Sequence, residues 1–306
     1  MDDYITAYEY EKNVNPDLKV IPVTHNNVQD CNYGINFLNF SDIYNVDYEC
    51  TTPNLLAGFI KIHKNDNDPT ILSNGITYNS ECNVFNATSN LFFVLHGSCD
   101  IYVDSDKYTL SEGDILITPI FGSLTIQRKS DEDLNIYYIN DSPLVNYLGS
   151  RPTRKIFKTA VYSKEFLMTN LLNLSDPKNN RKGILLSNKD TERIGTNTIT
   201  PVLWSLYNEL PPNTVQRPHK HNSVAIDLCI SCEDSENIYT LIGEELDEKG
   251  NIIHPMRVQW KSGEMFITPP GLWHSHNNMG NTFAYILPIQ DAGLLLYQRI
   301  LGIVLN

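Results

Sequence analysis

The sequence predicts an all-β protein made of two similar barrels, because of its strand pattern, its residue usage and an internal repeat. Short apolar runs separated by turn residues extend from about residue 57 to 139 and again from about 197 to 287, a spacing typical of sandwiches and barrels. The chain has 306 residues, of which 41% are hydrophobic, enough to fill the cores of two domains. Its 17 tyrosines favour strands, and its frequent asparagines favour turns.

The internal repeat consists of one segment that occurs in both halves of the chain. Residues 112–119 read Glu-Gly-Asp-Ile-Leu-Ile-Thr-Pro, and residues 262–269 read Ser-Gly-Glu-Met-Phe-Ile-Thr-Pro. Each copy has a glycine, an acidic residue, an apolar run and Ile-Thr-Pro in the same order, and the two copies lie 150 positions apart. The repeat therefore predicts that the second barrel is a duplicate of the first.

The positions of the strand-rich stretches divide the chain into five segments. We expect an N-terminal extension over residues 1–55, a first barrel over 56–145, a linker with a helix over 146–195, a second barrel over 196–291 and a C-terminal segment over 292–306. The linker helix is expected at 164–174, and a shorter helix at 4–11. The apolar stretch at 294–305 fits either a closing helix or a strand.

Charge and composition exclude several classes of function. The formal net charge is −13, whereas a nucleic-acid-binding protein needs a basic surface to neutralise phosphates, and anionic membranes also repel such a chain. The start Met1-Asp2-Asp3-Tyr4 lacks the basic residues and apolar run of a signal peptide, and no stretch approaches the roughly 18 apolar residues of a membrane helix. We therefore expect a cytoplasmic protein with no nucleic-acid partner and no membrane contact.

The histidines are concentrated in the second half of the chain. Four of the eight form the pairs His219-Lys220-His221 and His274-Ser275-His276. Side chains two positions apart on a strand point to the same face, so each pair offers two imidazoles to one cavity. Imidazole is a good ligand for Zn, Cu, Fe and Ni. An isolated pair of this kind is more often two surface histidines, so further features of the sequence must decide between a surface and a metal site.

A set of turn residues before the second pair favours the metal site. Its marked positions are Gly263, Pro269, Gly271, His274 and Asn278, in which glycine and proline shape a turn that leads into a strand. In this spacing, and in Pro218-His219-Lys220-His221, the sequence resembles the cupin superfamily. The resemblance implies two cupin (jelly-roll) barrels with short connecting helices, and one metal ion held in the second barrel by His219, His221 and His274.

A closer resemblance is to bicupin ring-cleaving dioxygenases of the gentisate and salicylate 1,2-dioxygenase type. It is carried by Thr268-Pro269 and by Trp273-His274-Ser275-His276. Enzymes of that family hold Fe(II) with three histidines and no glutamate, and here the usual glutamate positions are Ala225 and Ile226. The resemblance implies Fe(II), with Zn, Mn or Ni as alternatives, and O2 and a small molecule as partners. It gives His276 the role of a catalytic acid/base or of a hydrogen-bond donor to the substrate.

Asp227 marks the main departure from that family. The family has an arginine at this position, six residues after the second histidine, where it binds the substrate carboxylate; an aspartate repels an anion there. We therefore expect Asp227 to contact a neutral phenol, a polyol or a cationic amine, or to orient a histidine N–H. It becomes a metal ligand only if its strand bulges. Arg217 is a candidate partner for Asp227, and Arg217 and Arg181 are the cations to examine if acids bind nonetheless.

The first barrel shows no comparable set of histidines. His96 ends an apolar run without a His-x-His pair before it, and no histidine follows the turn at Pro119-Ile120-Phe121-Gly122. We interpret His96 as a structural residue. The first barrel is expected to be free of metal and to serve packing and dimerisation, which predicts a homo-oligomer.

The function that we expect is that of a mononuclear non-haem metal oxygenase, with Fe(II) as the metal and a small, chelating and phenolic molecule as substrate. Two other functions remain open. One is a cupin isomerase or lyase that uses Zn, Mn or Ni, and the other is a binding or storage protein without turnover. Dependence on O2 separates the first two functions. A cavity plugged by aromatic side chains would favour the third.

Overall fold

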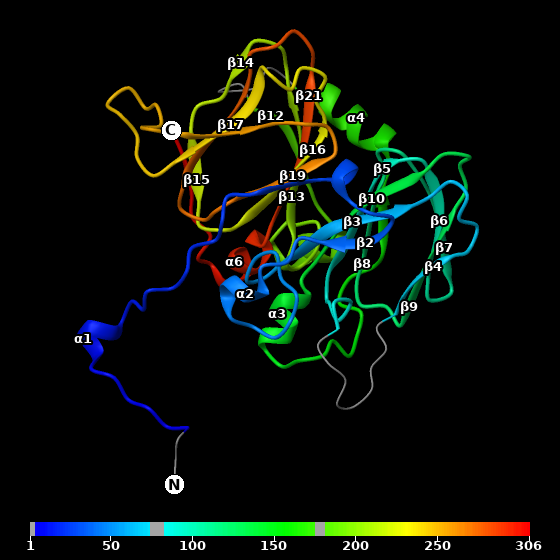
Figure 1. Ribbon diagram of the computed structural model, residues 1–306, viewed down its shortest axis with the longest axis horizontal. Helices are drawn as coiled ribbons and strands as arrows, with labels where there is room; N and C mark the ends of the chain where they lie inside the picture. The colour runs from blue at the N-terminus through cyan, green and yellow to red at the C-terminus, as the bar shows by residue number, and fades with distance from the viewer. Residues whose placement is uncertain (1–3, 74–82, 175–180) are drawn as a thin grey trace.

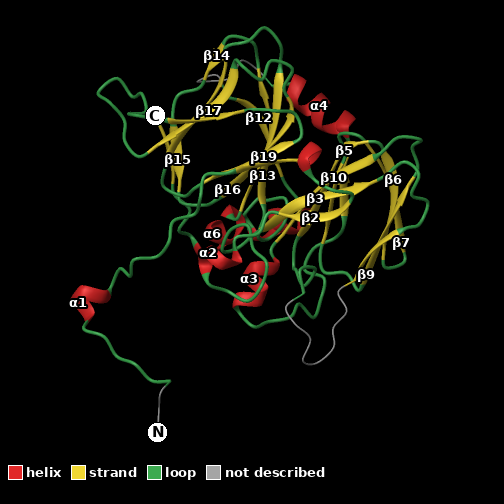
Figure 2. Ribbon diagram, viewed as in Figure 1, coloured by secondary structure: helices red, strands yellow, loops and turns green. Residues whose placement is uncertain are grey.

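The computed structural model describes residues 4–73, 83–174 and 181–306. Two barrels of antiparallel strands form the body, and the helices are short and lie around the strands (Figure 2). The N-terminal stretch stands away from this body (Figure 1, dark blue) and carries helix α1, Tyr10–Asn13. The prediction of an all-β fold with two barrels and short helices is confirmed. No helix in the described part of the chain is long and apolar enough to cross a membrane.

The first barrel consists of two antiparallel sheets. Its strands are β2 Gly34–Phe37, β3 Leu56–Ile62, β4 Thr70–Ser73, β5 Asn90–His96, β6 Ser98–Val103, β7 Asp106–Ser111, β8 Ile115–Thr118, β9 Ser123–Arg128, β10 Leu134–Asn140 and β11 Ala160–Tyr162. One sheet has the order β11-β8-β5-β10-β3-β2, and the other has the order β4-β9-β6-β7. Buried apolar residues from both sheets fill the space between them.

The second barrel has the same two-sheet plan. Its strands are β1 His25–Asn27, β12 Lys182–Leu186, β13 Trp204–Leu210, β14 Thr214–Val215, β15 His219–His221, β16 Ala225–Ser231, β17 Ile238–Gly243, β18 Met256–Gln259, β19 Glu264–Thr268, β20 Trp273–Asn278, β21 Ala284–Gln290 and β22 Ile303–Leu305. One sheet has the order β1-β19-β16-β21-β13-β12. The other has the order β18-β17-β20-β15-β22, with β14 paired to β20.

Each barrel gains a short edge strand from a segment outside its main run of strands. Strand β1, which precedes the first barrel, pairs with β19 of the second barrel, with His25 opposite Phe266. Strand β11, which follows the first barrel, pairs with β8, with Ala160 opposite Ile117. The repeated Ile-Thr-Pro segments are therefore equivalent in position, since each forms a strand that pairs with a three-residue strand lying outside residues 56–145 and 196–291.

The outer faces of the two barrels share one apolar core. Successive side chains of a strand point to opposite faces, so on β10 Tyr138 faces the interior of the first barrel, whereas Tyr137 faces the second barrel. On β16, Ile226 and Leu228 join the same inter-barrel core, whereas Asp227 points into the second barrel. Burial on both faces explains why these strands read as nearly continuous apolar runs.

The remaining helices lie in the connections and at the C-terminus. They are the 3₁₀ helix Val28–Asp30, α2 Ser41–Tyr44, α3 Ser142–Tyr147, α4 Lys164–Leu172, α5 Lys189–Ile194 and α6 Ala292–Gln298. The linker helix is found as predicted, and Ser163 caps it by accepting a hydrogen bond from the Phe166 N–H at 3.1 Å. The helix predicted at 4–11 is wrong in position, because α1 begins only at Tyr10. The C-terminal stretch forms both α6 and β22.

Candidate metal centre

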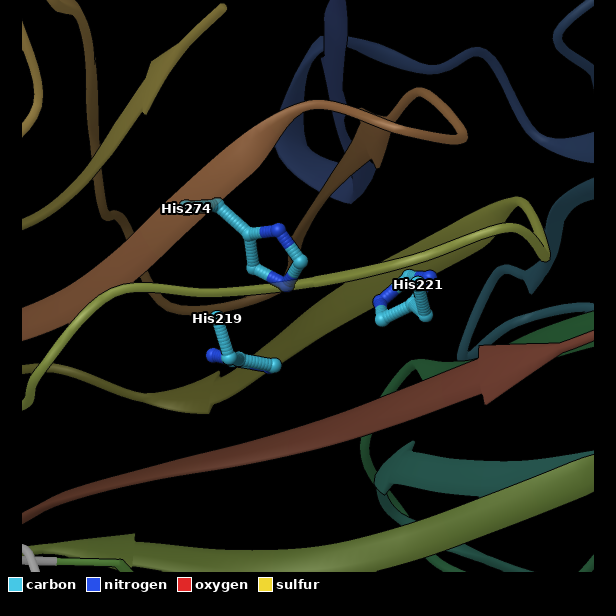
Figure 3. A group of neighbouring side chains, drawn as sticks. All are labelled: His219, His221 and His274. Carbon is cyan, nitrogen blue, oxygen red and sulfur yellow. The ribbon is translucent and has the colours of Figure 1, made fainter. Parts of the chain in front are cut away.

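Three imidazoles meet where β15 and β20 lie side by side in the second barrel. His219 lies directly opposite His274 in the pairing of these strands, and their ring centroids are 4.1 Å apart. His221 is on the same face of β15, with its ring centroid 4.8 Å from that of His274. Figure 3 shows His274 turned from one strand towards the pair on the other. One potential ligand atom from each residue lies within 4.8 Å of the others.

A glycine in a left-handed conformation joins the two histidine motifs. The N–H of Gly271 donates to the carbonyl of His221 at 2.7 Å, so the turn before β20 is fastened to β15. Gly271 has a φ of +79°, which glycine adopts without the steric cost that a Cβ brings. Gly271, one of the turn residues marked in the sequence, therefore helps to place His274 opposite His219.

Hydrogen bonds fix which nitrogen is free in two of the three rings. Nδ1 of His221 lies 2.9 Å from the Ser223 carbonyl, and Nδ1 of His274 lies 3.1 Å from the Leu272 carbonyl. A carbonyl can only accept, so in each ring Nδ1 carries the proton and Nε2 keeps its lone pair. Nδ1 of His219 is buried and has no hydrogen-bond partner within the described residues. This orphaned nitrogen and the two oriented rings fit a metal ion.

Burial also favours the charge state that a metal requires. It lowers the pKa of His221, and it lowers the pKa values of His219 and His274 well below the ordinary value of 6.5. Neighbouring histidines lower the last two further. Metal ligation requires neutral imidazole, so the three rings are already in the form that binds.

Asp227 lies in the same cavity but outside the group of three. Its carboxylate oxygen Oδ2 accepts a hydrogen bond from the Thr268 hydroxyl at 2.7 Å, and the residue is buried. Strand β16 is regularly paired with β19 at Asp227, and its irregularity falls between Cys229 and Ser231. Asp227 could act as a metal ligand only if β16 bulged at this residue, and the strand has no bulge there. Burial raises its pKa to about 7, with the Thr268 hydrogen bond opposing the shift.

His276 is the fourth imidazole of the site and has different partners. It lies two residues beyond His274 on β20, so it shares the face of His274. Its Nδ1 is 2.8 Å from the Thr240 hydroxyl, which also accepts a hydrogen bond from Trp260 Nε1–H at 2.8 Å. Burial, and then the neighbouring His274, lowers the pKa of His276 well below 6.5. The His276 ring therefore lines the cavity as a neutral group, and the Thr240 hydroxyl contacts its Nδ1.

A cavity of about 200 Å³ opens beside these imidazoles. Its wall includes two cations that follow each other in the chain, Arg181 and Lys182. Lys182 is paired, because its Nζ lies 2.7 Å from Oε1 of the buried Glu209. Arg181 donates from Nη2 to the Arg217 carbonyl at 2.6 Å, and its buried Nε has no hydrogen-bond partner in the described part of the chain. Arg181 thus brings a positive charge to the cavity.

Arg217 does not take the place considered for it from the sequence. Its side chain is exposed, and it reaches the site only through the backbone carbonyl that Arg181 contacts. The pairing of Arg217 with Asp227 is therefore not observed. The sequence indicates Arg181 only as a cation to examine if acids bind, because it lies 38 positions before His219 and no local pattern connects the two.

The interior of the first barrel is filled where the second is hollow. Phe92 and Tyr138 stack inside it with centroids 4.4 Å apart, and the Tyr138 hydroxyl donates to Oδ1 of Asn90 at 2.8 Å. His96 lies at the surface, with Nδ1 3.5 Å from Glu112 and Nε2 3.1 Å from Glu132. Of the described residues, only His219, His221 and His274 form a group suited to a metal.

Comparisons with known proteins agree on the fold. No protein-family model matches the sequence, and no curated protein matches it. Among solved structures, a point mutant of salicylate 1,2-dioxygenase from Pseudoaminobacter salicylatoxidans, in complex with gentisate, superposes with a TM-score of 0.70. It covers 96% of this chain and 88% of its own at 13% identity. A further structure of this dioxygenase gives 0.69, with 98% and 92% covered at 13% identity.

The likeness extends over both barrels. A second mutant of the same dioxygenase in complex with gentisate gives a TM-score of 0.68 at 12% identity, again with 96% of this chain covered. Identities this low show the fold alone. The protein therefore has the two-barrel cupin fold of a salicylate 1,2-dioxygenase, and its second barrel contains three histidines placed to hold a metal ion.

Proposed function

We propose that the protein is a mononuclear non-haem Fe(II) oxygenase that acts on a small chelating substrate with a phenolic oxygen. The convergence of His219, His221 and His274 beside an open cavity carries this proposal. The fold of a ring-cleaving dioxygenase supports it. Three neutral nitrogen ligands from the protein leave positions on a metal ion for other molecules. When bound, Fe(II) supplies the redox chemistry that lets O2 react with an organic molecule.

The size of the cavity supports a substrate with one ring. An apolar cavity of about 150 Å³ holds benzene, so the cavity of about 200 Å³ has room for a ring with small substituents. Its lining includes no Phe, Tyr or Trp among the described residues. The aromatic plug that would favour a storage protein is therefore not seen in the described lining, and the space next to the imidazoles is open to a ligand.

The charged groups of the cavity support a substrate with an ionisable oxygen. Arg181 faces the cavity with its Nε unpaired among the described residues, and guanidinium groups stabilise phenolate and carboxylate oxygens. Asp227 has a pKa of about 7 and is thus often protonated near neutral pH. In that form it donates a hydrogen bond rather than repelling an anion. We assign Arg181 to the ionised oxygen, Asp227 to a second polar group, and His276 to a hydrogen bond with the substrate.

A metal-dependent isomerase or lyase uses the same donor set, because imidazole also binds Zn and Ni. Dependence on O2 separates it from an oxygenase. The test is purification without O2, loading with Fe(II), Zn(II), Mn(II) or Ni(II), and an oxygen-electrode screen of catechol, phenol and salicylate derivatives. Of the four metals, we expect only Fe(II) to support O2 uptake with a substrate, and we expect no uptake by the His221→Ala variant. Turnover that proceeds equally well without O2 would contradict the oxygenase and favour an isomerase or lyase.

The remaining parts of the proposal concern assembly and location. We propose a cytoplasmic homo-oligomer, with the filled first barrel available for contacts between subunits. Light scattering of the purified full chain measures the mass directly. A mass of 34.8 kDa at all concentrations would contradict the oligomer.

A further inference from the structure

A chain of three buried side chains runs behind the metal centre. Trp260 Nε1–H donates to Thr240 Oγ1 at 2.8 Å, and Thr240 Oγ1 lies 2.8 Å from Nδ1 of His276. Trp260 and Thr240 are completely buried, and His276 is 5% exposed. Thr240 lies opposite His276 in the pairing of β17 with β20, so the sheet itself sets this contact.

Counting donors and acceptors fixes the direction of these hydrogen bonds. Tryptophan can only donate, so it uses one lone pair of the Thr240 oxygen. The hydroxyl proton then has His276 Nδ1 as its one acceptor among the contacts of the described residues. If Nδ1 were itself protonated, Thr240 would accept twice and its proton would be left without an acceptor in a buried site, which is unfavourable.

The partners at Nδ1 divide three of the four imidazoles into two kinds. His221 and His274 face backbone carbonyls, which force the proton onto Nδ1 and leave the lone pair on Nε2. His276 faces a hydroxyl whose own proton points at Nδ1, which leaves the ring proton on Nε2. The contrast explains why His276 stays out of the ligand set.

We propose that Trp260 and Thr240 are positioning residues that hold His276 as the Nε2–H tautomer, so that His276 presents a hydrogen-bond donor to the cavity. The corner of the substrate next to His276 must then be an acceptor, such as a carbonyl or an ionised oxygen. The tautomer follows from the hydrogen bonds of Trp260, Thr240 and His276 alone, whereas the acceptor on the substrate rests on the proposed function. His276 is assigned as a donor to the substrate and not as the base that removes its proton.

The tautomer is measured by nitrogen-15 NMR of the full chain with labelled histidine, loaded with diamagnetic Zn(II). Long-range proton–nitrogen correlations distinguish Nε2–H, Nδ1–H and imidazolium rings, and the spectrum of His276→Gln identifies the signals of His276. We expect the Nε2–H pattern in the wild type. An Nδ1–H or imidazolium pattern would overturn the assignment, whether or not the protein proves to be an oxygenase.

Variants of Thr240 test the positioning role. Thr240→Ser retains the hydroxyl and should retain the Nε2–H pattern, whereas Thr240→Val keeps the shape and should lose it. Affinity for the anionic chelator 4-nitrocatechol, titrated against the Zn(II) protein, should fall roughly tenfold in Thr240→Val and stay within about twofold in Thr240→Ser. Trp260→Phe should give a mixture of tautomers. If Thr240→Val leaves both the spectrum and the affinity unchanged, Thr240 has no positioning role.

Discussion

Asp227 is a carboxyl group whose charge the fold tolerates poorly. It is 2% exposed, and burial raises its pKa from 3.8 to about 7, while the Thr268 hydrogen bond opposes the shift. Asparagine has the same shape and still accepts from Thr268, so Asp227→Asn removes the charge and little else. We expect the metal-free variant to be more stable than the wild type at high pH, with a difference that disappears towards pH 4.

The sign and size of this effect follow from the two pKa values. Between pH 3.8 and about 7 the folded state binds more protons than the unfolded state, so the free energy of unfolding falls as pH rises. The contribution of the protonated group is fully present below the unfolded pKa and is lost as pH rises through the folded pKa. The full pKa difference corresponds to about 4 kcal/mol, at about 1.4 kcal/mol per unit.

Urea unfolding of chelator-treated protein between pH 5 and pH 8 measures the effect. The advantage of Asp227→Asn should grow by about 2–3 kcal/mol over this range, and the exposed control Asp131→Asn should show no such growth. Loading with Zn(II) should reduce the pH dependence of the wild type, because a nearby cation favours the ionised carboxyl. An advantage of Asp227→Asn that does not change with pH would show that Asp227 is not a buried group of raised pKa.

Three further predictions concern the metal and the cavity. Elemental analysis should find about one metal ion per chain, lost almost completely in His219→Ala and His274→Ala; metal retained in both variants would place the site elsewhere. His96→Gln should keep the metal content and change the free energy of unfolding by less than about 0.5 kcal/mol, since its ion pairs are exposed. Arg181→Met should weaken the binding of salicylate, measured by calorimetry, by roughly tenfold or more. An affinity equal to that of the wild type would remove Arg181 from the anion site. In the same assay, Asp227→Arg should strengthen the binding of salicylate.

The strands that the sequence predicts are those with a local signal. The run at Asn90–His96 and the repeated segments at Ile115–Thr118 and Glu264–Thr268 carry their apolar pattern within themselves. By contrast, β1 and β11 are three residues long, and their pattern says nothing about their partners. Strand β1 pairs with the second barrel although it precedes the first, and β11 pairs with the first barrel although it lies in the linker. Such non-local pairing leaves no periodicity to detect.

The same distinction applies to the site. The three histidines placed to bind metal were found because His-x-His on a strand and the glycine and proline turn are local patterns. Arg181, Thr240 and Trp260 reach the site through sheet pairing and packing, from positions that no motif connects. The charge of Asp227 could not be predicted either, because sequence supplies the carboxyl group, whereas burial decides its pKa.

The pairing of strands shows which interior positions of the two barrels are equivalent. Asn140 lies opposite Asn90 in the first barrel, and Gln290 lies opposite Ala225 in the second. Counting two residues inward from these pairs places Phe92 and Tyr138 at the positions of Asp227 and Pro288.

At these equivalent positions the two barrels make opposite use of their interior. The stacked aromatic pair fills the first barrel, and burying a large apolar side chain stabilises a fold by about 1.5–3 kcal/mol. The second barrel gives up that stabilisation, since Asp227 and Pro288 leave the cavity that the imidazoles face. Asp227→Phe should therefore move the second barrel towards the first, with higher thermal stability and no binding of salicylate. A variant that still binds salicylate would show that the ligand sits elsewhere in the barrel.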